Sequence, residues 1–308
     1  MNKKNKIVVI GSSNTDMVIS AAHFPKPGET IMGHGFLSNH GGKGANQAVA
    51  AARLGGDVSF IGKVGNDSLG ESAFEMLGRE GIDLSCMTST DEQPSGVALI
   101  TLDSNGENTI IVNPGANGML SEEDIEKSEP VIREAKIMLM QLETPVRTLV
   151  RAARMAKKYG VYVVLNPAPF PGDPLPEELL ANTDLLIPNE TEAMAIAGVD
   201  TFDADTAPLI MKKIQETGVK DVVITMGSKG VLTSIGGHMV AVPACKVKAV
   251  DTTAAGDTFC GALCVALCNG AGMEESLKFA NAASSITVTR MGAQISMPYL
   301  QEVKNEII

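Results

Sequence analysis

Short apolar runs rich in β-branched residues alternate with longer segments of helical periodicity along most of this chain. The runs have the length of strands and show no polar alternation, which is typical of strands buried on both faces of a parallel sheet. We predict six such strands, at residues 7–10, 58–61, 137–141, 161–165, 185–188 and 222–225.

Amphipathic segments lie between most of these runs. We predict helices at residues 45–54, 68–80, 122–135, 146–159, 204–217 and 258–269. A glycine follows five of them, as expected of the left-handed residue that ends a helix: Gly55, Gly81, Gly160, Gly218 and Gly270. The alternation predicts an α/β fold, a three-layer α/β/α sandwich around a mostly parallel sheet.

Two segments interrupt the alternation, at residues 18–36 and 96–112. In the second, two apolar runs flank Asp103-Ser-Asn-Gly-Glu107, which indicates a hairpin. We predict that the segments pair as a small β-sheet lid over the strand ends, inserted at approximately 15–40 and 95–114. No linker or repeat is evident, so residues 1–308 are interpreted as a single α/β domain.

The composition narrows the class of partner. The chain has 308 residues, 44% hydrophobic, with a formal net charge of −11. This acidic balance argues against nucleic-acid or anionic-membrane partners, which need clustered Lys and Arg. No apolar run approaches the roughly 20 residues of a membrane span, and the polar residues 1–6 resemble no signal peptide, so we expect a cytoplasmic protein.

The five cysteines fit a reducing compartment. Cys260, Cys264 and Cys268 recur every four residues and so share one helix face. Metal sites usually have paired cysteines or histidines in loops, so we predict that these three are buried small side chains.

Two glycine-rich or polar turns are candidate sugar sites. Gly11-Ser-Ser-Asn14-Thr-Asp16 directly follows the first strand, at the sheet edge where α/β proteins bind ligands, and Asn14 and Asp16 suit sugar hydroxyls. The alternative is an ordinary polar turn. His40 to Ala48 is a glycine-rich turn that enters a helix; its glycines would let a polyol approach the backbone, with Lys43 and Asn46 as donors. The alternative is a tight turn with a glycine N-cap.

Two further loops suit a nucleotide. Asn189 and Glu192 lie three residues apart at a predicted helix start, where they could hold hydrated Mg²⁺, or simply complement the helix dipole. The loop from Thr225 to Gly230, which includes Gly227, Ser228 and Lys229, follows a strand and suits phosphates and ribose, with a hairpin turn as the alternative.

The segment from Asp251 to Phe259 carries the most specific chemistry. The small residues Ala254, Ala255 and Gly256 would aim backbone N–H groups at one point, an anion hole for charge on a transferred phosphoryl group. Asp257 would sit beside this hole as a base for the acceptor hydroxyl, although an N-cap is the usual role of an Asp before a helix. Glu143 follows a strand at the same edge; alone it would be interpreted as a solvated loop residue.

These motifs in this order resemble the ribokinase family of carbohydrate kinases, from about residue 7 to residue 296. Gly41-Gly42-Lys43-Gly44-Ala45-Asn46-Gln47-Ala48 resembles the family's N-terminal signature, and Asp251-Thr-Thr-Ala-Ala-Gly-Asp257-Thr-Phe resembles the C-terminal one. The resemblance implies ATP-dependent phosphorylation of D-ribose at O5. It implies that Asp257 is the base, and that the backbone of residues 254–256 stabilises the phosphoryl group.

The resemblance also implies binding sites. Ribose would be held by Asn14, Asp16, Gly42, Lys43, Asn46, Glu143, Asp251 and Asp257. ATP would contact Asn189, Thr225, Gly227, Ser228, Lys229, Gly230, Gly256 and Asn281, where Asn281 replaces a histidine of some relatives, and Mg²⁺ would bind at Asn189 and Glu192 through water. A K⁺ activator, or another monovalent cation, would lie near Asp251, Thr253, Thr287, Arg290, Gly292 and Ser296. A homodimer would form through the lid sheets.

Two other classes of function stay open. A kinase for another sugar or nucleoside, such as fructose, 2-keto-3-deoxygluconate or adenosine, would carry the same motifs, since specificity depends on lid residues. A sugar or nucleotide sensor without catalysis would be expected to lack Asp257 or the Ala-Ala-Gly turn, and the chain has both.

Overall fold

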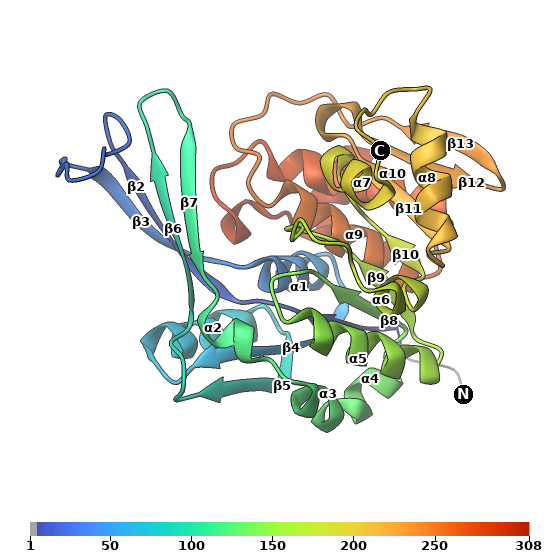
Figure 1. Cartoon of the computed structure of the whole chain (residues 1–308), viewed down its shortest axis with the longest axis horizontal. Helices are drawn as coiled ribbons and strands as arrows, with labels where there is room; N and C mark the ends of the chain where they lie inside the picture. The colour runs from blue at the N-terminus through green and yellow to red at the C-terminus, as the bar shows by residue number, and fades with distance from the viewer. Residues whose placement is uncertain (1–4, 308) are drawn as a thin grey trace.

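The computed structural model describes residues 5–307, so residues 1–4 and 308 of the predicted domain lie outside the described residues. A nine-stranded sheet with the order β13-β12-β11-β10-β9-β8-β1-β4-β5 forms the centre of the molecule (Figure 1). Seven strands, from β11 to β5, run parallel, and β12 is antiparallel to both of its neighbours. The strands are β1 (Lys6–Ile10), β4 (Asp57–Gly65), β5 (Asp83–Thr90), β8 (Ile137–Met140), β9 (Tyr162–Leu165), β10 (Leu185–Leu186), β11 (Asp221–Thr225), β12 (Val231–Ile235) and β13 (His238–Val242).

The strand order reverses next to β1. From β1 the chain continues outward through β4 and β5 on one side, and later through β8 to β11 on the other. The loops after β1 and β8 therefore leave the sheet in opposite directions, and such a switch point opens a crevice at the carboxyl ends of the strands. The sheet topology places a binding crevice at residues 11–16 and 141–144.

Helices cover both faces of the sheet, which confirms the predicted three-layer fold. In β1, Ile7 and Val9 pack into one core while Val8 and Ile10 pack into the other, because successive strand side chains point to opposite faces. One layer contains α1 (Lys43–Arg53), α2 (Ser68–Arg79), α9 (Ala255–Cys268), α10 (Met273–Thr287) and α11 (Leu300–Ile307). The other contains α3 (Glu122–Lys127), α4 (Glu129–Glu134), α5 (Val146–Lys158), α6 (Glu177–Ala181), α7 (Glu190–Ala197) and α8 (Ala207–Glu216).

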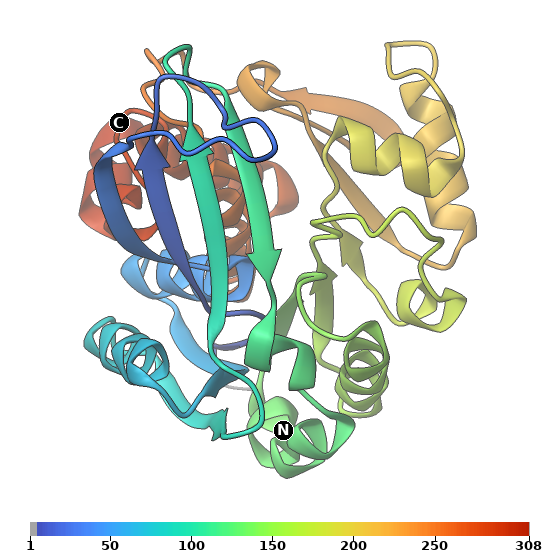
Figure 2. The ribbon, with the colours of Figure 1, turned by 60° about the vertical axis from the view of Figure 1, so that its left-hand side comes forward.

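A four-stranded sheet projects from the body, as Figures 1 and 2 show. Its order is β3-β2-β6-β7, from β2 (Asn14–Ser20), β3 (His34–Gly41), β6 (Gly96–Leu102) and β7 (Asn108–Asn113). The two segments that interrupt the α/β alternation thus pair with each other, β2 with β6 in parallel. We call these four strands the lid sheet.

Several predicted elements differ from the observed ones. The helix predicted at 122–135 is two short helices, because Ser128 ends α3 and Pro130 lies in the first turn of α4. Proline is tolerated in a first turn but would break the interior of a continuous helix. The strand predicted at 185–188 pairs over two residues only. Helix α10 was not predicted because its small and polar residues give a weak amphipathic pattern, although most of them are buried against α9.

Other local predictions are confirmed. All five glycines expected after helices have positive φ angles, between 63° at Gly160 and 103° at Gly218. Cys260, Cys264 and Cys268 are buried free thiols in α9. Among residues 5–307, no helix is long and apolar enough to cross a membrane.

Candidate active site

The glycine-rich turn between β3 and α1 packs directly on the loop that follows β1. Gly42 has φ 86°, and a Cβ there would lie 2.7 Å from the Asn14 nitrogen. A Cβ on Gly44 would lie 2.5 Å from the nitrogen of Ser12. We expected these glycines to let a polyol approach; they instead let two protein loops touch, because the space beside them is filled by backbone.

Lys43 is the first residue of α1 and lies among carboxylates. Burial lowers the pKa of its ammonium group, but the negative charges of Asp257, Glu143 and Glu192 outweigh burial and raise it. These residues come from α9, the loop after β8 and α7, so the structure gathers charges from distant parts of the chain. Lys43 stays positively charged at neutral pH and partly neutralises an otherwise acidic centre.

Asp16, at the start of the lid sheet, is the carboxyl group most affected by this centre. Burial raises its pKa, and Glu143 and Asp257 raise it further, whereas Lys43 lowers it; the net result is a pKa of about 6. The carboxyl also fills the space beside Gly41, where a Cβ would lie 2.2 Å from Asp16 Oδ2. Asp16 is therefore held in place and changes charge close to neutral pH.

Asn14 and Glu143 are fixed by hydrogen bonds in the switch-point crevice. Glu143 accepts from the Ser12 hydroxyl and, at 2.9 Å, from the backbone N–H of Lys43. Asn117 Nδ2 donates to Asn14 Oδ1 at 2.8 Å, and Asn117 Oδ1 accepts from the backbone N–H of Ser13. Glu143, which alone resembled a solvated loop residue, thus ties the loop after β8 to the start of α1.

The first turn of α9 begins with strained backbone. Ala254 is the N-cap and has φ 60°, the only positive φ outside glycine in residues 5–307. This conformation costs an L-residue about 1–2 kcal/mol, so the surrounding structure imposes it. Gly256 is exposed, and nothing lies within 4 Å of where its Cβ would be. The turn is therefore open beside Gly256 at the positive end of a helix, where an anion would be stabilised, while the Ala255 N–H donates to Thr252 O at 3.3 Å.

Asp257 lies inside the helix, two residues after its first residue, and is not the N-cap. Its side chain is 7% exposed. Asn46 Nδ2 donates to one carboxylate oxygen at 2.9 Å, and Gln47 Nε2 donates to the other at 3.0 Å. A buried carboxylate held by two neutral amides, next to an anion hole, is placed as a general base would be.

Asn189 and Glu192 form a reciprocal capping box at the start of α7. Asn189 Oδ1 accepts from the Glu192 N–H at 2.8 Å, and Glu192 Oε2 accepts from the Asn189 N–H at 2.9 Å. Burial raises the pKa of Glu192, although the Asn189 hydrogen bond and Lys43 oppose it. Within the described chain Glu192 Oε1 has no hydrogen-bond partner, so one oxygen is left for a hydrated cation.

The loop from Thr225 to Gly230 joins β11 to the antiparallel strand β12, so it is a hairpin connection at the same sheet edge. Thr225 bridges Asn189, which brings the two predicted nucleotide loops side by side. Ser228 and Lys229 are exposed. Asn281 in α10 donates both of its observed hydrogen bonds to backbone carbonyls, those of Val242 and Pro243, and so it anchors the loop after β13.

Hydrogen bonds link most of the residues predicted to surround a monovalent cation, but Thr287 makes its contact elsewhere. Asp251 accepts hydrogen bonds from Thr253 and, at 2.8 Å, from the Gly292 N–H. Burial raises the pKa of Asp251, but these hydrogen bonds outweigh burial and lower it below its ordinary value. Arg290 pairs with Glu302 and lies 3.5 Å from the carbonyl of Ser296. The Thr287 side chain instead faces Thr258 in the buried contact between α9 and α10.

Sequence reasoning did not assign a role to several buried or half-buried amides that the fold joins to the predicted site residues: Gln47, Asn117, Gln141, Asn166 and Gln294. A signal was available for one of them, since Asn46-Gln47 is a polar pair inside an alanine-rich helix. Their partners lie up to 248 residues away, so only the fold reveals the contacts.

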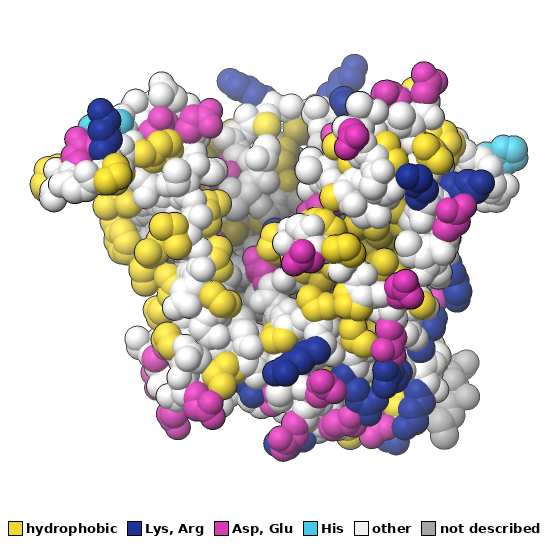
Figure 3. Space-filling model, in the orientation of Figure 1, with side chains coloured by type: hydrophobic (Ala, Val, Ile, Leu, Met, Phe, Trp, Pro, Cys, Tyr) yellow, Lys and Arg dark blue, Asp and Glu magenta, His cyan; other side chains and the backbone are white. Residues whose placement is uncertain are grey.

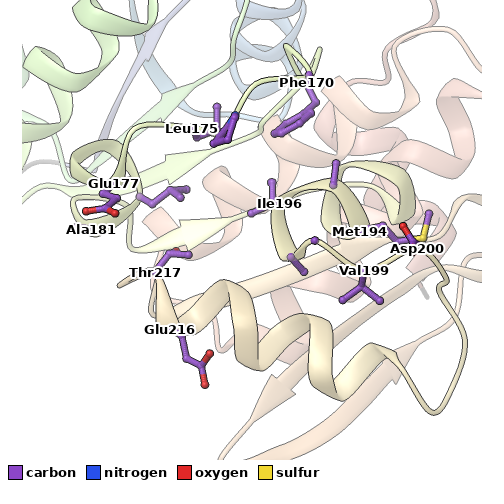
Figure 4. Close-up of a pocket in the computed structure, with 16 residues that line it drawn as sticks. Phe170, Leu175, Glu177, Ala181, Met194, Ile196, Val199, Asp200, Glu216 and Thr217 are labelled. Carbon is purple, nitrogen blue, oxygen red and sulfur yellow. The ribbon is translucent and has the colours of Figure 1, made fainter.

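A hollow separates the lid sheet from the rest of the molecule (Figure 3). A separate cavity of about 1040 Å³ lies between α6, α7 and the end of α8, lined by Phe170, Leu175, Met194 and Ile196 among others (Figure 4). None of the predicted site residues lines it. The convergence of charged and amide groups therefore identifies the candidate site better than cavity size does.

Comparison with known proteins identifies relatives of this chain by sequence and by fold. A model of the pfkB family carbohydrate kinases matches residues 4–300. The chain is 44% identical over 299 residues to the ribokinase of Haemophilus influenzae, with 97% of each chain covered. It is 36% identical to a deoxyribokinase of Salmonella typhi, with 96% of each covered. The structure of Arabidopsis thaliana ribokinase complexed with ribose and ATP superposes with a TM-score of 0.92 at 37% identity, covering 100% of this chain and 99% of that one.

The chain therefore belongs to the pfkB family of carbohydrate kinases. The resemblance read from its two signatures is confirmed, as is the fold that the resemblance implied.

Proposed function

We propose that this chain transfers the γ-phosphoryl group of ATP to O5 of D-ribose, giving D-ribose 5-phosphate and ADP, with Asp257 as the general base. The observation that carries the base assignment is the position of Asp257: a buried carboxylate, fixed by two amides, in the same helical turn as the open backbone at Gly256. The choice of ribose is supported by curated ribokinases and by a ribokinase structure with ribose and ATP.

The reaction needs one proton transfer and stabilisation of charge. Asp257 accepts the proton of the O5 hydroxyl as the oxygen attacks the γ-phosphorus, and the bond to the ADP leaving group breaks. The backbone at residues 254–256 and the dipole of α9 stabilise the charge on the transferred group. Lys43, positively charged and beside Asp257, balances the acidic centre.

The sugar would lie in the switch-point crevice. Asn14, Asp16, Lys43, Asn46 and Glu143 supply acceptors and donors for its hydroxyls. Gly42 contributes by letting the two loops that carry these groups pack together. Asp251, the remaining member of the predicted set, is held by Thr253 and Gly292, which donate to its two oxygens.

The nucleotide would lie along the ends of β10 and β11, against Asn189 and the hairpin Thr225–Gly230. Magnesium, the ion that neutralises ATP phosphates, fits Asn189 and Glu192, whose free oxygen and helix position suit an ion that keeps most of its waters. A monovalent cation would bind through backbone carbonyls near Asp251 and Gly292, which the structure joins directly. There it would brace the turn that carries the anion hole.

A homodimer through the lid sheets is the assembly that the surface supports. Strand register places Met17, Leu99 and Ile111 in one row, on the face opposite Asp16. Leu99 is 51% and Ile111 71% exposed, and Figure 3 shows apolar side chains gathered over these strands. A second copy of the chain would cover this apolar face with its own and so remove both from water. We place the enzyme in the cytoplasm, where its free cysteines persist as thiols.

The Asp257→Asn variant tests the base. Asparagine keeps the shape but cannot accept the proton, so kcat should fall about 10³-fold, within the range for a general base, while calorimetric binding of ribose and ATP stays within a few-fold of wild type. The matched control is Asp221→Asn, which removes a carboxylate at the first residue of β11, outside every predicted site. Full activity of Asp257→Asn would sink the base assignment.

A further inference from the structure

Asp257 stands at the end of two chains of buried amides. In one, Gln141 Nε2 donates to Gln47 Oε1 at 2.6 Å, and Gln47 Nε2 donates to Asp257 Oδ1 at 3.0 Å. In the other, Gln294 Nε2 donates to Asn46 Oδ1 at 3.1 Å, and Asn46 Nδ2 donates to Asp257 Oδ2 at 2.9 Å. Each carboxylate oxygen therefore receives one N–H from a group whose own orientation is fixed.

Gln47 differs from Asn46 in its access to a ligand. Asn46 is 6% exposed, whereas Gln47 is 0% exposed in the middle of α1. Its amide nitrogen is shared between Asp257 and Asn166, 3.0 Å from each acceptor. Gln47 is thus enclosed by protein groups and acts on a substrate only through Asp257.

Gln141 fixes which way the Gln47 amide points. Because Gln47 Oε1 accepts from Gln141, its nitrogen must face the carboxylate. The other end of the Gln141 amide, Oε1, is buried and has no hydrogen-bond partner in residues 5–307. A Cβ on Gly11 would lie 2.2 Å from this atom, so a glycine is needed beside it. An unpaired buried oxygen costs stability, which indicates that Gln141 is not placed for stability alone.

From this geometry we infer that Gln47, held by Gln141, is a positioning residue that keeps the Asp257 carboxylate aimed at the acceptor hydroxyl. The inference rests on the proposed role of Asp257. A carboxylate can rotate about its χ2 bond, and a base that points away from the hydroxyl does not react. Donors on both oxygens stop this rotation, while each oxygen keeps lone pairs for the substrate.

The test is Gln47→Met, which keeps the length of the side chain but removes the amide. We expect kcat to fall about 10- to 100-fold, part of what a general base contributes, with KM for ribose within about 3-fold. The readout of positioning is this split between a lowered kcat and a nearly unchanged KM, because a misdirected base slows the reaction without emptying the sugar site. Gln141→Met should lower kcat by less, again with little change in KM for ribose.

Two controls separate positioning from stability. Thr233→Val removes a buried hydroxyl that donates to Val222 O, a bond that involves neither Asp257 nor the amides around it, and it should lower the melting temperature without changing kcat. In the double variant Gln47→Met with Asp257→Asn, activity should equal that of Asp257→Asn alone, because Gln47 acts through a carboxylate that is no longer there.

The outcomes are distinguishable. A Gln47→Met enzyme with wild-type kcat, beside an inactive Asp257→Asn, overturns the positioning role and leaves the proposed function intact. Full activity of Asp257→Asn overturns the base assignment and the positioning role together. If Gln47→Met does not fold, Gln141→Met carries the same test, and an unchanged kcat in that variant overturns the inference.

Discussion

The sugar side and the nucleotide side of the crevice are built differently. On the sugar side, the loops after β1 and β3 press together so tightly that a Cβ at Gly42 or Gly44 would lie within 3 Å of backbone. On the nucleotide side, Ser228 and Lys229 are exposed, and nothing lies within 4 Å of a Cβ at Gly227. The fold thus fixes the proposed sugar site and the proposed base before any ligand binds. It leaves the tip of the β11–β12 hairpin open, although Gly230 at its end packs on backbone, where a Cβ would lie 2.2 Å from Val242 O. Substitutions should therefore have larger effects near α1 and α9 than in the β11–β12 hairpin.

The largest effect among the tests of this contrast is expected at Gly256, where the two sides meet. Gly256→Ala puts a methyl group into space that is open without ligand, so folding should be unaffected or stabilised by up to about 1 kcal/mol, the helix preference of Ala over Gly. The methyl group would narrow the open space that the proposed anion hole offers to the transferred phosphoryl group. We expect kcat to fall about 10²-fold, comparable to the loss of one anion-hole donor. Steady-state kinetics measures kcat, and a thermal melt of the same preparation measures stability. An unchanged kcat would contradict the anion hole.

A smaller effect is expected from the pH dependence of ribose binding. With a pKa of about 6, the Asp16 carboxylate becomes protonated below that pH, and the neutral carboxyl group accepts weaker hydrogen bonds from hydroxyls than the ion does. If only the ionised form binds, KM for ribose should be about tenfold higher at pH 5 than at pH 7. Asp16→Asn should show a raised KM that does not vary across this range. A KM for ribose that is flat with pH in wild type would remove Asp16 from the sugar site.

The same group makes a separate contribution to stability. Its pKa in the folded protein lies above the ordinary value of 3.8, so between pH 3.8 and about 6 the native state binds a proton that the unfolded chain has released. Stability from this group therefore falls as the pH rises through that window. Asp16→Asn should raise the melting temperature of the ligand-free protein at pH 7 and change it less at pH 4.

The smallest effect is expected at Lys229. Its side chain is 72% exposed and lies 3.4 Å from Glu190, a pair that solvent screens. Lys229→Met should raise KM for ATP by less than about 3-fold and leave ribose binding unchanged, since a surface ion pair is worth at most about 1 kcal/mol. A change of 100-fold or more would mean that the nucleotide side is as tightly built as the sugar side.

The sequence predicted what depends on local pattern. Glycines after helices, the layered α/β order and the turn at residues 254–256 all follow from short-range periodicity and backbone preference. It did not predict the split at Ser128, because the apolar period continues across it, or helix α10, whose buried face is made of small polar residues. The role of Gln47 was also beyond reach, since its partner Asp257 lies 210 residues further along.

The most direct test of the account is the product formed from ATP by the wild-type enzyme. ATP consumption should be measured with D-ribose, 2-deoxy-D-ribose, fructose, 2-keto-3-deoxygluconate and adenosine, with and without K⁺, and the phosphorylated position determined by phosphorus–proton NMR. The account predicts that D-ribose gives the highest kcat/KM, that its product carries the phosphate on O5, and that K⁺ raises the rate. Higher kcat/KM for one of the other four acceptors, or phosphate on a different oxygen of ribose, would contradict it.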